Sequence, residues 1–253
     1  MRLYIRILIL ICACLFAAAC ATTTAPQFRS HPHLNEKLGQ TGTITVVPLN
    51  VDVYQLSAGG VKEKIDEWCF LARRNVLTAV EEELKQIPLL NLKSFSETAI
   101  SENQKSNLEQ TSALFNAIST SIILHTYGPP DHRFPEKIQN FDYSLGTEVS
   151  ELSEQTDALL LVQAMDHIST AGRKALQAGS VILGALVGVA VTPNLGITVV
   201  SIALVDAQSG DILWYNFHGS GGAHDLRNPI DTTLLVKNIL SPFPLRKVEK
   251  LND

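Results

Sequence analysis

The strongest constraint on the fold is an apolar run in the middle of the chain, ALLLVQAM at residues 158–165. Successive side chains of a β-strand point to opposite faces of the sheet, so a run that is apolar throughout presents apolar groups on both faces. Strands of this kind are typical of a central position in a sheet that is covered on both sides. The sequence therefore predicts a buried central strand at residues 158–165.

Other segments carry the patterns of strands. Residues 43–49 (TITVVPL) are rich in β-branched side chains, and residues 89–95 are predicted to form a second, short strand. Residues 196–206 and 211–218 flank a short polar stretch that ends in Gly210, which suits the left-handed position of a hairpin loop. We expect these two segments to pair as a hairpin.

Four segments are predicted to be helical. Residues 62–86, 101–124 and 229–240 repeat apolar residues at helical spacing, and residues 145–154 form a shorter helix. Residues 127–143 are rich in proline and polar residues, which favours a long irregular loop. The elements alternate between strand and helix in a single domain, for which the length of 253 residues is sufficient.

The N-terminus resembles a bacterial lipoprotein signal. Arg2 and Arg6 precede an apolar run at 7–19 that is too short for a spanning helix, and the run ends in small residues before Cys20. The resemblance implies removal of residues 1–19, acylation of Cys20 (with palmitate among the acyl chains) and attachment to the membrane through this residue. Three alternatives remain open: cleavage before Cys14, an uncleaved anchor, and an ordinary secretory signal.

Acylation at Cys20 sets further expectations. Cys12 and Cys14 would leave with the signal, so Cys69 alone would remain free and no disulfide could form within one mature chain. The formal net charge of −5 becomes more negative when the two signal arginines leave, which argues against nucleic acid as a partner. Ala21 after the cysteine favours the outer membrane, by resemblance to enterobacterial sorting.

The domain boundaries follow from the same reading. Residues 20–42 are predicted to form a flexible tether, since they are mostly polar and contain prolines. Residues 43–245 are predicted to form one periplasmic domain, and residues 246–253 a charged tail.

A second apolar concentration lies far from the N-terminus. No residue between 175 and 205 is charged, and Pro193 and Gly196 break the span. The part of this span before Pro193 is predicted to form a further helix. Ser180, Gly184 and Gly188 recur every fourth residue in it, so one face of this helix carries only small side chains. Three interpretations compete: a helix packed on the sheet, a contact between subunits, and a segment that dips into the membrane.

The candidate interface residues come from this helix and from the irregular loop. Ser180, Gly184 and Gly188 would allow close approach of another backbone. Long loops inside a domain are often binding or assembly elements, which adds the following loop residues: Tyr127, Pro129 and Pro130.

Motifs that carry chemistry are missing from the sequence. It contains no Walker A loop, no G-x-S-x-G and no H-E-x-x-H motif, so we expect no cofactor, no catalytic residue and no metal site. His31 and His33 are interpreted as an incidental surface pair. The loop from His218 to Gly222 is similar to the oxyanion loop of some esterases, which keeps an envelope hydrolase or small-molecule-binding lipoprotein as the alternative function.

Three phrases resemble periplasmic lipoproteins related to the curli-secretion lipoprotein CsgG and to the N-terminal domain of TolB. They are ITVVPL at 44–49, TDALLLV at 156–162 and VDAQSGDILW at 205–214. The resemblance implies an α+β fold in which helices pack on a mixed β-sheet of about five strands. It also implies assembly with protein partners or with further copies of the chain. No pair of alternating membrane hairpins is visible, so we do not expect pore formation.

Together these observations predict a non-enzymatic, outer-membrane-anchored lipoprotein that faces the periplasm. Its predicted role is that of an assembly or accessory component of an envelope secretion or transport complex.

Overall fold

The computed structural model describes residues 28–38, 42–88, 90–96, 101–152, 156–186 and 196–245. These residues form an α+β fold in which helices cover a mixed sheet of seven strands, so the predicted fold class is confirmed. The predicted signal peptide, Cys20, Gly188 and the predicted charged tail lie outside the described residues.

The sheet has the strand order β1-β7-β6-β5-β2-β3, and β4 pairs with β2. The strands are β1 (Phe28–Ser30), β2 (Thr43–Leu56), β3 (Lys62–Lys64), β4 (Asn91–Ser94), β5 (Ala158–Ser169), β6 (Gly196–Asp206) and β7 (Ile212–Ser220). β2 runs parallel to β4 and β5, and the other pairs are antiparallel. β5 is central, as predicted, and the β6–β7 hairpin is confirmed.

The hairpin loop depends on a glycine, as the sequence predicts. Gly210 has φ of 75°, in the left-handed region, and a Cβ at this position would clash with the backbone oxygen of Gly146. The chain therefore needs glycine here for conformation and for space.

Two short strands raise the count above the five that were expected. Lys62–Lys64 lies in the predicted helix but pairs with the end of β2, and the helix begins only at Asp66. Asp66 and Glu67 place negative charge in the first helical turn, where the helix dipole favours it. The other additional strand is β1, which lies within residues 20–42, the range predicted to be a flexible tether. It is held on the domain because Phe28 packs against the core.

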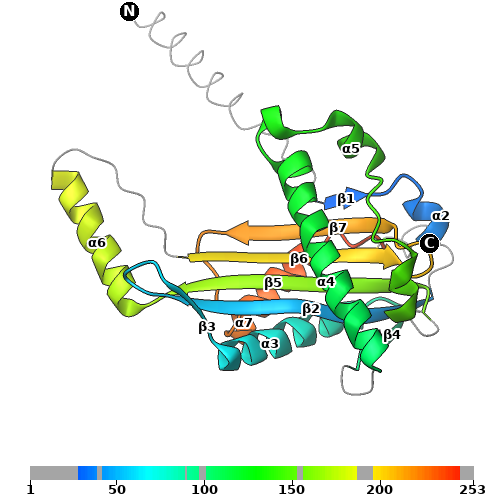
Figure 1. Cartoon of the computed structure of the whole chain (residues 1–253), viewed down its shortest axis with the longest axis horizontal. Helices are drawn as coiled ribbons and strands as arrows, with labels where there is room; N and C mark the ends of the chain where they lie inside the picture. The colour runs from blue at the N-terminus through cyan, green and yellow to red at the C-terminus, as the bar shows by residue number, and fades with distance from the viewer. Residues whose placement is uncertain are drawn as a thin grey trace, which may run out of the picture.

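The helices lie on both faces of the sheet (Figure 1). Their bounds are α2 (Leu34–Leu38), α3 (Asp66–Leu84), α4 (Glu102–Ile122), α5 (Pro135–Asn140), α6 (Ala171–Leu186) and α7 (Pro229–Leu240). A π-helical turn, Ile123–Tyr127, extends α4, and short 3₁₀ turns follow at Pro130–His132 and Thr147–Leu152. The predicted irregular segment 127–143 therefore contains short helical pieces.

The alternation along β5 shows why both faces must be covered. Leu160 and Val162 belong to the core that α3 and α7 cover. Leu159 and Leu161 belong to a second core, which lies beneath α4. Each set leaves water on its own side, so the apolar run is stabilised by helices on both faces.

The position of α6 shows that one of the three interpretations of the uncharged segment, a helix packed on the sheet, was wrong. α6 does not pack on the sheet; it projects from one end of the strands (Figure 1), and Leu176, Ile182 and Leu183 are exposed. The physical reason is that α6 follows the end of β5, beyond the region that α3, α7 and α4 cover. The small-residue repeat is therefore no evidence of tight packing on the sheet.

Candidate functional site

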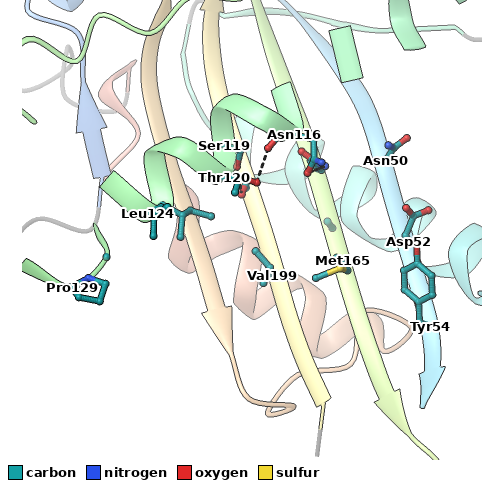
Figure 2. Close-up of a pocket in the computed structure, with 15 residues that line it drawn as sticks. Asn50, Asp52, Tyr54, Asn116, Ser119, Thr120, Leu124, Pro129, Met165 and Val199 are labelled. Atoms are coloured by element: carbon teal, nitrogen blue, oxygen red, sulfur yellow. Dashed lines mark hydrogen bonds between the residues drawn. The ribbon is translucent and has the colours of Figure 1, made fainter. Parts of the chain in front are cut away.

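A concavity lies on the α4 face of the sheet. α4 covers Leu159 and Leu161 but leaves the following part of β5 open, and a groove of about 710 Å³ results. Figure 2 shows Asp52, Met165 and Val199 rising from three neighbouring strands toward it. The opposite wall comes from the C-terminal half of α4 and the π-helical turn.

Hydrogen bonds fix the floor of the groove where α4 meets the sheet. The hydroxyl oxygens of Ser119 and Tyr215 lie 2.7 Å apart, and the Tyr215 hydroxyl donates to Ser201 Oγ at 3.1 Å. Burial raises the pKa of Tyr215 to about 12, because the phenolate would be poorly solvated there. These three hydroxyls hold the helix against strands β6 and β7.

Gln163 is the polar residue of the floor with an unmet hydrogen-bonding group. Its Nε2 donates to Asn116 Oδ1 at 3.1 Å, whereas its Oε1 is buried and accepts no hydrogen bond from the described residues. Buried polar atoms are nearly always paired in folded proteins, so this acceptor indicates a place for an external donor.

The β2 side of the groove carries a charge pair. Lys64 Nζ lies 2.6 Å from Asp52 Oδ1, and this hydrogen bond raises the pKa of Lys64. Beside the pair, the ring of Tyr54 meets the ring of His167 edge-on at 5.3 Å. The groove therefore combines apolar side chains, amides, hydroxyls and one neutralised carboxylate.

Of the three predicted loop residues, the structure places Pro129 at the groove. Pro129 lines the groove, and both Pro129 and Pro130 are exposed. Tyr127 is half-buried instead, with its ring 4.8 Å from that of Phe217 and 4.9 Å below the guanidinium of Arg29. Tyr127 thus supports the loop from inside, and the role of the three residues in an interface stays a prediction.

The helical interface residues lie elsewhere. Ser180 and Gly184 belong to α6, and the Ser180 hydroxyl donates to the carbonyl of Gln177 in the same helix. The structure brings neither of them to the groove. Their predicted role as an interface stays untested.

The esterase-like alternative finds an incomplete arrangement. His218 lies in a strand, as predicted, and β7 extends beyond it to Ser220, so the first part of this loop belongs to the sheet. A cleft of about 270 Å³ connects Gly222 with His167 and Ser169, but the Ser169 hydroxyl has no hydrogen-bond partner in the described chain. A serine nucleophile needs a base within hydrogen-bonding reach, and this serine has none in the structure.

The histidines near this cleft are perturbed by burial. Burial and the neighbouring His224 lower the pKa of His218, whose ring lies 5.1 Å from that of His224. Burial, followed by the charge of Lys62, lowers the pKa of His167.

Asp166, next to His167 in the chain, points to the opposite face of the sheet. There its carboxylate accepts hydrogen bonds from Thr198 Oγ1 at 2.9 Å and from the backbone N–H of Leu226 at 3.0 Å. Burial nevertheless raises its pKa. Asp166 and His167 do not meet, as the strand geometry predicts.

The described ranges contain neither a metal-binding cluster nor a helix suited to span a membrane. No group of three or more His, Cys, Asp and Glu side chains in them is placed to hold a metal ion. Among the helices that the structure describes, none has the length and apolar character needed to cross a membrane.

Comparisons with known proteins give weak likenesses. Neither the protein-family models nor the curated proteins contain a match. Among solved structures, a PelC dodecamer from Paraburkholderia phytofirmans is similar at TM-score 0.32 and 10% identity, over 87% of this chain and 94% of that chain. The LpoB C-terminal domain from Salmonella enterica is similar at TM-score 0.24 and 13% identity, over 76% of this chain and 95% of that chain.

TM-scores this low carry no argument about the function of this chain. The resemblance to CsgG and TolB likewise stays a prediction. The function is therefore inferred from the residues of the groove, from α6 and from the predicted N-terminal signal.

Proposed function

We propose that this protein is a non-enzymatic lipoprotein anchored in the outer membrane by acylated Cys20, with its domain in the periplasm. It acts as an accessory or assembly component of an envelope secretion or transport complex. In this proposal the groove on the α4 face binds a segment of a protein partner.

The buried oxygen of Gln163 is the observation that carries the proposal. A groove floor with an unpaired acceptor is matched by a partner that supplies an N–H or O–H donor, because the bond removes the cost of leaving that oxygen unsatisfied. A peptide segment provides such donors along its backbone. Around this atom, Met165, Val199 and Leu124 offer apolar area that the segment would cover.

The groove also has the properties of a pre-formed site. The hydrogen bonds among Ser119, Ser201 and Tyr215 fix its floor before any partner arrives. Binding to such a surface requires little ordering of side chains, which lowers its entropic cost.

Photo-crosslinking in cells tests the groove. A photoreactive residue replaces Thr120, which lines the groove, and in a matched variant it replaces Leu114, which is exposed on the same helix and does not line the groove. We expect a discrete crosslinked protein with the Thr120 variant and at least about fivefold less with the Leu114 variant. Equal crosslinking at both positions would contradict the proposal.

The anchor is tested separately. Mass spectrometry of the mature N-terminus should show acyl chains on Cys20, and a Cys20→Ala variant should lose them. A Cys20→Ala protein that is still acylated would refute the assignment of this residue.

A further inference from the structure

In α6, apolar side chains face the solvent and several polar side chains face the domain, whereas a surface helix usually has the opposite arrangement. Leu176, Ile182, Leu183 and Leu186 have exposed fractions of 61%, 62%, 66% and 76%. Their spacing of three, four and seven residues places them on one side of the helix. A continuous apolar surface of this kind marks an interaction site and is rare on a protein with no partner for it.

The polar side chains of α6 lie toward the rest of the domain. Arg173, Gln177 and Ser180 are half-buried, and Arg173 Nη1 donates to the carbonyl of Ser57, in the turn between β2 and β3, at 3.3 Å. The Thr170 hydroxyl accepts from the backbone N–H of Arg173 and thereby caps the first turn. These contacts fix the helix with its apolar side outward.

We propose that α6 inserts its apolar side into the interfacial layer of the bilayer in which Cys20 is anchored, lying in the plane of the membrane. The chemistry of the partner is that of a phospholipid surface with anionic headgroups. This inference depends on the acylation of Cys20 in the proposed function and adds a second membrane contact made by the folded domain.

The charges on α6 complement such a surface. Between Ala171 and Leu186 there is no acidic residue, and the two charged residues are Arg173 and Lys174 near its N-terminal end. The whole chain has a formal net charge of −5, whereas α6 carries a net positive charge. Basic residues beside an apolar helical face are typical of helices that bind anionic membranes.

The length of chain between anchor and domain places the bilayer within reach. At about 3.3–3.6 Å per residue, the segment from Cys20 to Phe28 can span at most roughly 30 Å. The domain therefore stays close to the membrane surface, which gives α6 a high effective concentration there.

The helix length favours insertion in the plane of the bilayer. The described part of α6 has 16 residues, or about 24 Å at 1.5 Å per residue, which is less than the hydrocarbon thickness of about 30 Å. With polar groups directed toward the protein along one side, the opposite side is the part available to lipid.

A fluorescent probe on the full-length acylated protein tests this contact. Cys69→Ser removes the free thiol of the described chain, and Leu183→Cys provides one for an environment-sensitive dye. The matched variant carries Leu114→Cys on α4 instead. In vesicles of phosphatidylglycerol and phosphatidylcholine, we expect quenching by spin-labelled lipid to be at least about threefold stronger at position 183 than at position 114.

The charge contribution has its own variant. Lys174 is exposed, and Lys174→Glu should at least halve the quenching at position 183 on anionic vesicles while leaving vesicles of phosphatidylcholine alone little affected. Circular dichroism shows whether each variant keeps its fold.

Two results would overturn the inference. One is equal quenching by spin-labelled lipid at positions 183 and 114, which would show that both dyes are equally exposed to water. The other is a dye that is shielded in proportion to protein concentration and not by lipid, which would assign the apolar side to a second copy of the chain.

Mass spectrometry separates this test from that of the anchor. Acylated Cys20 with a solvent-exposed probe at 183 refutes the α6 contact alone. Absence of acyl chains refutes the anchor, and quenching on added pre-formed vesicles then decides whether α6 binds lipid.

Discussion

The two faces of the sheet differ in how much of their length is covered. On the α3 and α7 face, apolar side chains pack along the strands, and the aromatic rings of Trp214 and Phe243 close the end of that core. On the α4 face, the core stops after Leu161, and Gln163 and Met165 continue the same strand in the groove. Both faces therefore carry a core that stabilises the fold, and the α4 face has surface left for binding as well.

The largest difference between the faces should appear on truncating side chains of β5. Leu160→Ala empties a fully buried position on the α3 and α7 face and should lower the free energy of unfolding by about 2–5 kcal/mol. Met165→Ala, in the groove, should cost about 1 kcal/mol or less, since that side chain is already half-exposed. Urea denaturation measures both, and equal losses would show that the groove is part of the core.

A smaller effect should come from the histidines of the two faces. In the folded protein, the pKa values of His167 and His218 lie below the ordinary histidine value of about 6.5. The unfolded chain therefore binds more protons as the pH falls through that value. The stability is therefore present near neutral pH and decreases as the pH falls through 6.5 toward the folded values. We expect the free energy of unfolding to decrease between about pH 7.5 and pH 5.5.

Single variants assign this loss to a face. His167→Gln removes the contribution of the α4 face, and His218→Gln that of the opposite face. A pH profile that neither substitution flattens would show that other groups cause the loss.

The smallest effect on stability, with a large effect on binding, is expected on filling the groove. Val199→Phe places a ring in open space and should change the free energy of unfolding by no more than about 0.5 kcal/mol. The same ring should block a partner, so crosslinking from position 120 should disappear. Leu114→Phe, outside the groove, should leave crosslinking unchanged.

Much of the fold was predictable because its signals are local. The apolar run of β5, the left-handed glycine at 210 and the bounds of α7 each follow from a few consecutive residues. β3 was missed because its Lys-Glu-Lys sequence carries no strand pattern and pairs only through the hairpin with β2.

The groove could not be predicted, since four segments distant in the sequence contribute to it. Asn50, Asp52 and Tyr54 alternate along β2, and Gln163 interrupts the apolar run of β5. This alternation is a signal of a half-exposed face, and it becomes visible once β2 is known to continue past Pro48. The position of α6 was equally inaccessible, because apolar spacing alone does not show whether a helix packs against protein or against another medium.

The two ends of the sheet limit how copies or partners can be added. β1 and β3 have three residues each, and β3 carries two lysines and a glutamate. Short and charged edge strands disfavour the extension of a sheet by a strand from another chain. Strand addition would thus find little backbone to pair with at either end, and recognition falls to side chains. The same short edges disfavour edge-to-edge aggregation of the domain.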